Sequence, residues 1–309
     1  MGVSALHRPT WAGRSGRLRA VLLVLSASAL FTFASALIKA VAPTIPTAEI
    51  VLFRGLIGCV VLLPLLLRRG GLGLFATRRP IGQATRALLG FLSTLGAYYG
   101  YYALPLATAT ALGFAMPLFV TVLSVPLLGE RVGWRRMSAV LAGFAGVLLV
   151  AHPWVDTGEV LPIGAVLIVL GAVLSWALGT IAVRRLGAAG ESAMTIVLYY
   201  SIGATLLAGA MVLRDWVTPP LLVLAGLIGV GAISAVAQVL TTEGYRTDET
   251  TLLAPFEYGA IIYAAALGAV FWGEWPDLPG WAGIVLIILS GLFIWRREVT
   301  LARRSALGR

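Results

Sequence analysis

Long apolar runs constrain this chain more than any other feature of its sequence. Each run contains about 20 residues, the length of a helix that crosses the hydrocarbon core of a bilayer. A strand of a membrane barrel needs only about ten residues, so the runs indicate helices. Ten of them follow one another, at about 20–42, 48–67, 82–104, 108–128, 134–151, 162–183, 192–213, 221–242, 250–272 and 279–295. The sequence therefore predicts an all-α integral membrane protein with ten transmembrane helices.

The charged residues are few and unevenly distributed. They make up 12% of the chain, against roughly 25% in soluble domains. Twenty of the 23 Lys and Arg residues fall in the tails and alternate loops, on one side of the ten-helix map, and the other side has only Lys39 and Arg214. Because basic loops stay in the cytoplasm, we expect cytoplasmic termini in a plasma (inner) membrane. We then expect the basic residues that give the net charge of +10 to contact anionic lipid rather than nucleic acid.

The basic N-terminal tail, 1–19, and the first apolar run together imitate a secretory signal peptide, with "ASA" at 34–36 as a cleavage site. We interpret the run at 20–42 as a retained helix, because it is longer than the apolar region of a usual signal peptide. Cys59 is the only cysteine and lies in a predicted span, which excludes an intrachain disulfide.

The two halves of the sequence resemble each other. "EIVLFRGLI" (49–57) resembles "TIVLYYSIG" (195–203), and "GERVGW" (129–134) resembles "GEWPDL" (273–278). "LFTFASALI" (30–38) likewise resembles "VLSWALGTI" (173–181). These matches keep the same order at offsets of 143 to 146 residues, which indicates an internal repeat.

The repeat predicts the domain organisation. Residues 20–152 and 162–296 form two five-helix units between basic cytoplasmic tails at 1–19 and 297–309. Five is an odd number, so the second unit enters the membrane from the opposite side. Inverted repeats around a central cavity are a recurring plan of secondary transporters. The alternative is a duplication that has no transport function.

Several of these features together resemble the drug/metabolite transporter superfamily, in its EamA-type branch. They are the two five-helix halves, the Gly-Glu pairs that end helices four and nine, and "YYALPLATATALGFAMPLFVTVLSVPLLGERVG" (101–133). The resemblance covers essentially the whole chain and implies both the fold and transport. It leaves the substrate open, because related carriers export amino acids or drugs, or take up flavins, nucleosides or S-adenosylmethionine.

Arg54 is a charged residue inside the second apolar run. Such a charge should face the bundle interior or a wet cavity and have a partner. Candidate partners are helix-end carbonyls, tyrosine hydroxyls or a substrate carboxylate, whereas Glu49 lies on another face of the helix. The repeat equivalent of Arg54 is Tyr200. Architectural or gating roles and substrate binding both remain open, and the resemblance favours the former, since related carriers with differing substrates have an arginine near this position.

Glu257 is the corresponding acidic candidate, near the cytoplasmic end of helix nine. A desolvated carboxylate can hold a proton at neutral pH, so Glu257 is a candidate for proton coupling or for binding a substrate amine. The alternative is a carboxylate satisfied by neighbouring hydroxyls or water.

Aromatic and polar residues are further candidates for the substrate pathway. The stretch "GAYYGYY" (96–102) has four tyrosines, which an aromatic belt at the membrane surface explains only in part, because four in five residues cannot all face lipid on a helix. Of these tyrosines, the candidates for the pathway are Tyr98, Tyr99 and Tyr102. Further aromatic side chains that could form its walls are Phe33, Trp176, Tyr258 and Tyr263. The candidate hydrogen-bonding residues are Thr32, Gln238 and Thr241.

Prolines and glycines predict breaks and turns. Pro117 and Pro255 interrupt helices four and nine and are candidate kinks or gates, or static kinks filled by packing. The pairs Gly129-Glu130 and Gly273-Glu274 are predicted to form structural turns, since glycine suits a helix end and glutamate the start of the next helix.

The glycine-rich stretches, such as "AGFAGV" (142–147), indicate close helix packing or a homodimer through helix five. The sequence contains no Walker-type phosphate loop, which argues against ATP as the energy source.

Three classes of function are compatible with a helical membrane protein of this kind. A secondary carrier for a small amphipathic metabolite, amino-acid-like and exported by alternating access, fits the repeat and the intramembrane charges. Uptake of a flavin, nucleoside or S-adenosylmethionine is the alternative within this class. A lipid-modifying membrane enzyme needs acid–base or metal residues, but the only histidines are His7 and His152, without a ligand cluster. An accessory subunit would not need buried Arg54 or Glu257. We therefore expect neither an enzyme nor a cofactor or metal.

Overall fold

The structure, a computed structural model, describes residues 14–129, 133–151, 162–247, 253 and 256–306. Every regular element in these residues is a helix, and each predicted apolar run contains one. The first half comprises α1 (Arg14–Val41), α2 (Thr47–Gly70), the 3-10 helix η1 (Gly71–Phe75), α3 (Pro80–Ala103), α4 (Leu106–Gly113), α5 (Met116–Leu128) and α6 (Trp134–Ala151). The second half comprises α7 (Ile163–Ala188), α8 (Ala193–Val212), α9 (Leu221–Thr247), α11 (Gly259–Trp272) and α12 (Leu278–Ala306).

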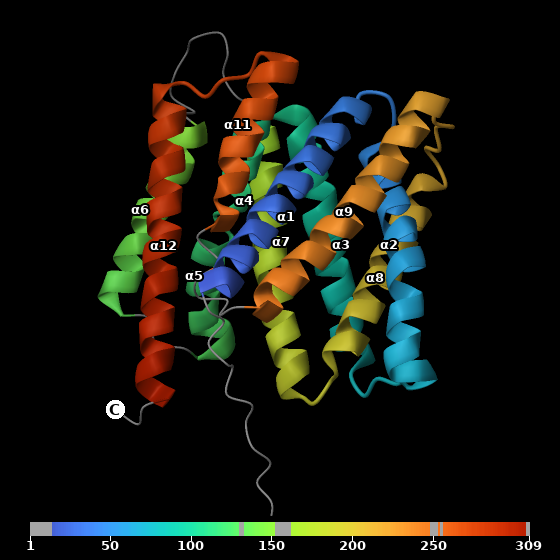
Figure 1. The fold of residues 1–309 in the computed structure, drawn as a ribbon, viewed down its shortest axis with the longest axis horizontal. Coiled ribbons are helices and arrows are strands. Elements are labelled where there is room, and N and C mark those ends of the chain that lie inside the picture. Colours follow the sequence, from blue (N-terminus) through green and yellow to red (C-terminus); the bar gives the residue numbers. More distant parts are fainter. Residues whose placement is uncertain (1–13, 130–132, 152–161, 248–252, 254–255, 307–309) are drawn as a thin grey trace, which may run out of the picture.

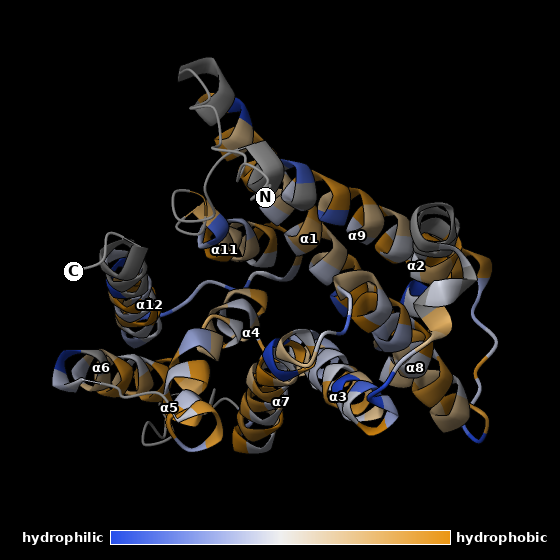
Figure 2. Ribbon diagram, turned by 90° about the horizontal axis from the view of Figure 1, so that it is seen from below, coloured by the Kyte–Doolittle hydropathy of each residue, from blue (hydrophilic) through white to orange (hydrophobic). Residues whose placement is uncertain are grey.

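The lengths and surfaces of the helices suit a bilayer. Among the described residues, six helical segments are long and apolar enough to cross a membrane, in α1, α4–α5, α7, α8, α9 and α12, and α6 and α11 contain shorter apolar stretches. Large apolar side chains are exposed around the bundle, among them Leu141, Leu167, Leu206, Ile262 and Val270. Figure 2 shows hydrophobic residues along most of the helices and hydrophilic ones mainly near their ends. Exposed apolar surface of this extent needs lipid to cover it.

The two halves run in opposite directions, as Figure 1 shows for α1 and α7. The start of α1 and the end of α12 lie at the same end of the bundle. The packing follows a pseudo-twofold relation: α1 packs on α9 as α7 packs on α3, and α1 packs on α11 as α7 packs on α5. The pairs α2–α8 and α6–α12 each join an element to its equivalent. The predicted all-α membrane fold with two inverted repeats is therefore confirmed.

Glycines of α6 allow close contact of this helix with α12 and with α5. A Cβ atom on Gly146 of α6 would lie 2.9 Å from the carbonyl oxygen of Gly283 on α12, and one on Gly283 would lie 2.6 Å from the carbonyl oxygen of Gly146. A Cβ atom on Gly143 would lie 2.6 Å from the Leu118 side chain. The glycines of "AGFAGV" thus allow close packing within the chain.

The fourth apolar run is broken in the middle. α4 ends at Gly113, Phe114 and Ala115 form a turn, and Pro117 occupies the first turn of α5, where proline needs no hydrogen-bonded N–H. In the second repeat, Tyr258 caps the start of α11. Phe114 and Tyr258 lie 144 residues apart, as Gly129 and Gly273 do, and their rings stack with centroids 4.6 Å apart.

Candidate functional site

The two ends of the bundle differ in charge. One end contains the C-terminus of α1 and the start of α2, and we call it the Lys39 end. The opposite end contains Arg78, Arg79, Arg184 and Arg185, and we call it the basic end. Both ends contain contacts that join the first repeat to the second, and an arginine–tyrosine cluster lies between them.

A buried ion pair joins the repeats at the Lys39 end. The Lys39 ammonium group, whose side chain is only 7% exposed, lies 2.6 Å from a carboxylate oxygen of Glu274. Lys39 also donates to the carbonyl oxygen of Leu104 at 2.8 Å, and the N–H of Leu106 donates to the other Glu274 oxygen at 3.1 Å. Glu274 therefore ties α1 and the α3–α4 junction to the end of α11.

The Gly-Glu pairs have a common backbone geometry where they are described. Gly129 and Gly273 cap α5 and α11 with φ values of 69° and 68°, in the left-handed region that glycine adopts without strain. The Glu274 N–H closes the turn by donating to the carbonyl oxygen of Gly268. Glu130 lies outside the described residues.

Arg54 is surrounded by tyrosines. Its guanidinium carbon lies 5.9 Å from the ring centroid of Tyr98 on α3, and the guanidinium group donates a hydrogen bond to the Tyr200 hydroxyl on α8. The ring of Tyr101 lies 6.2 Å from that of Tyr98, centroid to centroid. Tyrosine hydroxyls were one of the three predicted partner types. In the described parts of the chain, no carboxylate forms an ion pair with Arg54.

Arg86 of α3 contacts the ring of the same tyrosine. Its guanidinium carbon lies 4.3 Å from the ring centroid of Tyr200, a cation–π distance. The Thr94 hydroxyl lies 3.4 Å from the Tyr200 hydroxyl. Gly90 makes room for this arrangement, because a Cβ atom there would collide with the Tyr200 ring and the Arg86 guanidinium. Tyr200 thus contacts one arginine through its hydroxyl and another through its ring.

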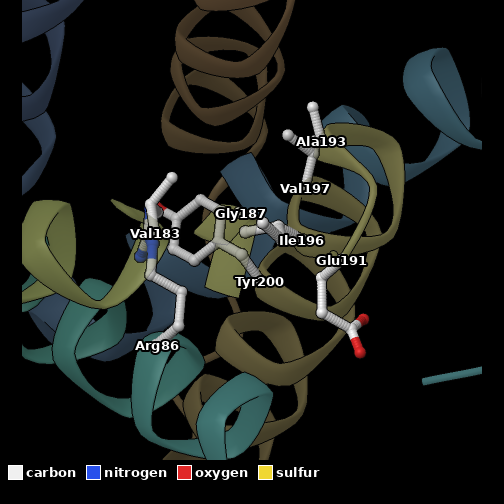
Figure 3. A pocket seen from close by; sticks show the side chains of 8 residues that line it. All are labelled: Arg86, Val183, Gly187, Glu191, Ala193, Ile196, Val197 and Tyr200. Atoms are coloured by element: carbon white, nitrogen blue, oxygen red, sulfur yellow. The ribbon is translucent and has the colours of Figure 1, made fainter. Parts of the chain in front are cut away.

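A cavity of about 290 Å³ opens beside this cluster at the basic end. Its lining comes from α3, α7, α8 and the α7–α8 loop, as Figure 3 shows, and comprises Arg86, Val183, Gly187, Glu191, Ala193, Ile196, Val197 and Tyr200. Arg86 and Tyr200 lie on one side of it, and the Glu191 carboxylate points away from them on the other. Apolar walls with a few polar groups are typical of small-molecule sites.

Glu191 fastens the α7–α8 loop to the start of α3. Its carboxylate accepts hydrogen bonds from the N–H of Arg78 at 2.9 Å and from the amide of Gln83 at 3.0 Å. Partial desolvation raises the pKa of Glu191, but the hydrogen bonds from Arg78, Thr77, Gln83 and Arg79 outweigh it and lower the pKa overall.

The Lys39 end has the equivalent contact. Glu49, in the first turn of α2, is fully buried and accepts a hydrogen bond at 3.3 Å from the N–H of Val217 in the α8–α9 loop. Each repeat thus has a glutamate near the start of its second helix that binds backbone N–H groups before the third helix of the other repeat. These two residues, Glu49 and Glu191, are called the paired glutamates below.

Comparison with known proteins identifies the chain. The sequence profile of the EamA-like transporter family matches it twice, at residues 18–151 and 163–296. The chain belongs to this family. These two matches coincide closely with the two inverted halves of the fold.

Curated relatives of this EamA protein are transporters of different small molecules. The pseudopaline exporter CntI of Pseudomonas aeruginosa is 33% identical over 279 residues, which cover 90% of this chain and 96% of the relative. The riboflavin transporter of Vibrio cholerae is 30% identical, with 84% and 87% covered. The S-adenosylmethionine uptake transporter of Rickettsia prowazekii is 28% identical, with 80% and 82% covered.

A solved crystal structure has the same fold, with a TM-score of 0.60 at 19% identity over 93% of this chain and 99% of the other. The family and the named relatives show that the EamA protein is a multi-pass membrane transporter of a small molecule and not an enzyme.

The remaining pathway candidates of this EamA protein are spread over the bundle. Phe33, Trp176 and Tyr102 are 42%, 48% and 48% exposed. The Thr32 and Thr241 hydroxyls donate hydrogen bonds to carbonyl oxygens within their own helices. The Gln238 side chain is exposed. The ring of Tyr99 contacts that of Tyr102. Glu257 and Tyr263 are half-buried, and Pro255 lies outside the described residues. The structure thus brings Tyr98 to Arg54, whereas Tyr258 packs in a different apolar cluster.

Three central residues were not recognised as site residues from the sequence. In the sequence, Lys39 and Arg86 have the appearance of basic residues at the ends of apolar runs, and Tyr200 is marked only as the repeat equivalent of Arg54. The signal for Tyr200 was present, because a residue that aligns with an intramembrane charge across a twofold relation is a natural candidate partner. Nothing in the local sequence distinguishes Arg86 from an exposed basic residue near a helix start.

Proposed function

We propose that this EamA protein is a secondary carrier that exports a small amphipathic organic metabolite, such as an amino acid or a derivative, by alternating access across the plasma membrane. The observation that supports this most directly is the contact of Arg54 with Tyr200 between inverted repeats. A polar contact on the pseudo-twofold relation can rearrange when the two halves exchange their conformations. Its neighbours Arg86 and Tyr98 would then border the substrate pathway.

The direction and orientation follow from two arguments. The basic end would face the cytoplasm, because Lys and Arg in short loops are retained there. Export is favoured by the similarity to CntI, which is named an exporter. Relatives named as riboflavin and S-adenosylmethionine transporters support uptake of a larger heterocyclic compound as the second candidate.

Glu257 is the candidate for proton coupling. It is a half-buried carboxylate next to Tyr258, at the start of α11, and a carboxylate in low dielectric exchanges protons near neutral pH. A carrier with this residue would move protons together with, or against, its substrate.

Flux into proteoliposomes tests the function. Purified protein is reconstituted with a pH-sensitive dye, and uptake of labelled amino acids, riboflavin and S-adenosylmethionine is compared with protein-free vesicles. We expect amino-acid flux that Arg54→Ala abolishes and Arg54→Lys partly retains, because an ammonium group keeps the charge but not the planar donor geometry. Glu257→Gln should uncouple the dye signal from flux. Flux of riboflavin or S-adenosylmethionine alone would favour the second candidate, and no flux of any compound would count against both.

A further inference from the structure

The two arginines that contact Tyr200 differ in how well they are satisfied. The Arg54 guanidinium has the Tyr200 hydroxyl as an acceptor and the Tyr98 ring against it. Arg86 has the face of the Tyr200 ring, and its Nε atom is buried without a hydrogen-bond partner among the described residues. Within the described residues, no carboxylate pairs with Arg86. The protein therefore supplies an acceptor and an aromatic ring for the Arg54 guanidinium, whereas Arg86 has N–H donors that are not used.

Arg86 is half-buried, and its buried Nε–H without an acceptor is costly. A guanidinium group has five N–H donors and stays charged at any physiological pH. Burying one of these donors without an acceptor removes the hydrogen bond that water would make with it, and a half-buried charge without a counter-ion adds to this cost. Arg54 contacts the hydroxyl of the same tyrosine and adds a second positive charge nearby. An anion bound beside Arg86 would accept hydrogen bonds from its unused donors and would compensate the unpaired positive charge.

The cavity beside Arg86 has room for such an anion. Arg86 borders it directly, and Ala193, the first residue of α8, is also in its wall, so the positive end of this helix dipole favours negative charge there. The acidic residue in the lining, Glu191, is engaged by Arg78 and Gln83. The rest of the wall is apolar, with Val183, Ile196 and Val197. A ligand that suits this cavity combines an anionic group with an apolar part.

We propose that Arg86 binds the anionic group, a carboxylate or phosphate, of the metabolite that this protein transports, while its apolar part lies against Val183, Ile196 and Val197. Arg54 is then a structural cation that fixes Tyr200, and it does not contact the substrate. This assignment rests on the proposed carrier function and makes the substrate an organic anion or zwitterion.

Binding of a matched pair of probes tests the assignment independently of transport. Phenylacetate and phenylacetamide have almost the same shape, but only the first is charged. Protein in phosphatidylcholine nanodiscs is titrated with each, and the concentration for a half-maximal rise in melting temperature is measured. We expect phenylacetate to stabilise the protein at a concentration at least about tenfold lower than phenylacetamide, since a hydrogen bond to a charged group contributes the equivalent of tenfold or more.

Four variants locate the anion site. Arg86→Gln should abolish the preference for phenylacetate, and Arg86→Lys should keep part of it as a point charge. Arg54→Gln should lower the melting temperature but retain the preference. Arg135→Gln, a matched control at an exposed arginine beside Trp134, should change neither. A preference that survives in Arg86→Gln, or one that is lost in Arg54→Gln instead, would overturn the assignment.

Two further measurements separate the sources of the anion. If inorganic phosphate stabilises the protein as well as phenylacetate does, the site needs no apolar part and the proposed ligand class is wrong. If phosphatidylglycerol in the nanodiscs prevents phenylacetate binding, the site belongs to a lipid headgroup and not to a substrate.

Flux distinguishes failure of this assignment from failure of the carrier function. Flux of an anionic metabolite that Arg86→Gln leaves unchanged would refute the role of Arg86 and keep the carrier. Charge-selective binding that depends on Arg86, without any flux in wild type, would keep an anion site but refute its role in transport.

Discussion

Arg54 of α2 and Tyr200 of α8 occupy equivalent positions in the two repeats and hydrogen-bond to each other. A symmetric pair would place two like residues at this contact, and two arginines would repel each other. The replacement of one arginine by tyrosine turns the contact into a donor–acceptor pair, with the ring of Tyr200 left free to cover Arg86. The second such pair, Phe114 with Tyr258, stacks two rings at the breaks of the fourth and ninth runs.

Tyr200→Phe should separate the two functions of this tyrosine. The variant loses the acceptor for Arg54 and keeps the ring against Arg86. Because a hydrogen bond to a charged group contributes about 1.5–3 kcal/mol, we expect a lower free energy of unfolding by about that amount, measured by denaturant titration in detergent. Tyr200→Leu, which also loses the ring, should be less stable still. Tyr102→Phe is the control, since Tyr102 is 48% exposed, and a loss equal to that of Tyr200→Phe would contradict the prediction.

Gly90→Ala should disturb the same cluster through packing. A single methyl group at this position collides with the Tyr200 ring and the Arg86 guanidinium, and overpacking of a filled interior costs about 1–3 kcal/mol. We expect reduced thermal stability and impaired flux. Gly171→Ala on α7 is the matched control, because a Cβ atom there has nothing within 4 Å and alanine favours the helix. If the two variants were equally stable, the cluster would accommodate the added methyl group without loss of stability, and the prediction would be wrong.

The sequence predicts the fold better than it predicts the site. Long apolar runs fix the helices, because no other backbone satisfies its own polar groups in lipid, and Pro117 marks the break between α4 and α5. The intramembrane position of Arg54 and its need for a partner also follow from the apolar residues around it.

Contacts between residues that are far apart in the sequence cannot be predicted from such local patterns. Lys39 and Glu274 are 235 positions apart, so only the packing of α1 against α11 brings them together. Arg86 lies six residues inside α3, and a basic residue so close to a helix start has the same sequence signature as a loop charge. The paired glutamates form their contacts with residues of the other repeat, for which no local pattern exists.

The Lys39–Glu274 ion pair should behave as a unit. Lys39→Met leaves the Glu274 carboxylate with only the Leu106 N–H, and Glu274→Gln leaves a buried ammonium group without its counter-ion. Removing one partner of a buried pair costs about 3–5 kcal/mol, and we expect about 3 kcal/mol here because Glu274 is 25% exposed. The double variant should be more stable than the sum of the two single losses predicts, which a double-mutant cycle of unfolding free energies measures. Additive losses would mean that the two residues act separately.

The same ion pair should also control access at its end of the bundle. In a Cys59→Ser background, a single cysteine introduced at Leu106 should react slowly with a membrane-impermeant thiol reagent added from the outside, and faster when Lys39→Met is added. A cysteine introduced at exposed Leu222, which lies outside this contact, is the control whose rate should not change. Equal rates at position 106 with and without Lys39→Met would show that the pair does not close the Lys39 end.

Glu191 should make stability depend on acidity at the basic end. Its hydrogen bonds lower its pKa below the ordinary value of 4.5, so the folded state favours the carboxylate and releases the proton more readily than the unfolded chain does. This contribution is complete above about pH 5 and is lost as the pH falls below 4.5 through the folded-state pKa. The difference in melting temperature between wild type and Glu191→Gln should therefore shrink between pH 6 and pH 3.5. Gln83→Ala removes one donor to the carboxylate and should weaken the pH dependence without abolishing it, because the N–H of Arg78 remains. A difference that stays constant over this pH range would show that the carboxylate of Glu191 does not hold the α7–α8 loop to the start of α3.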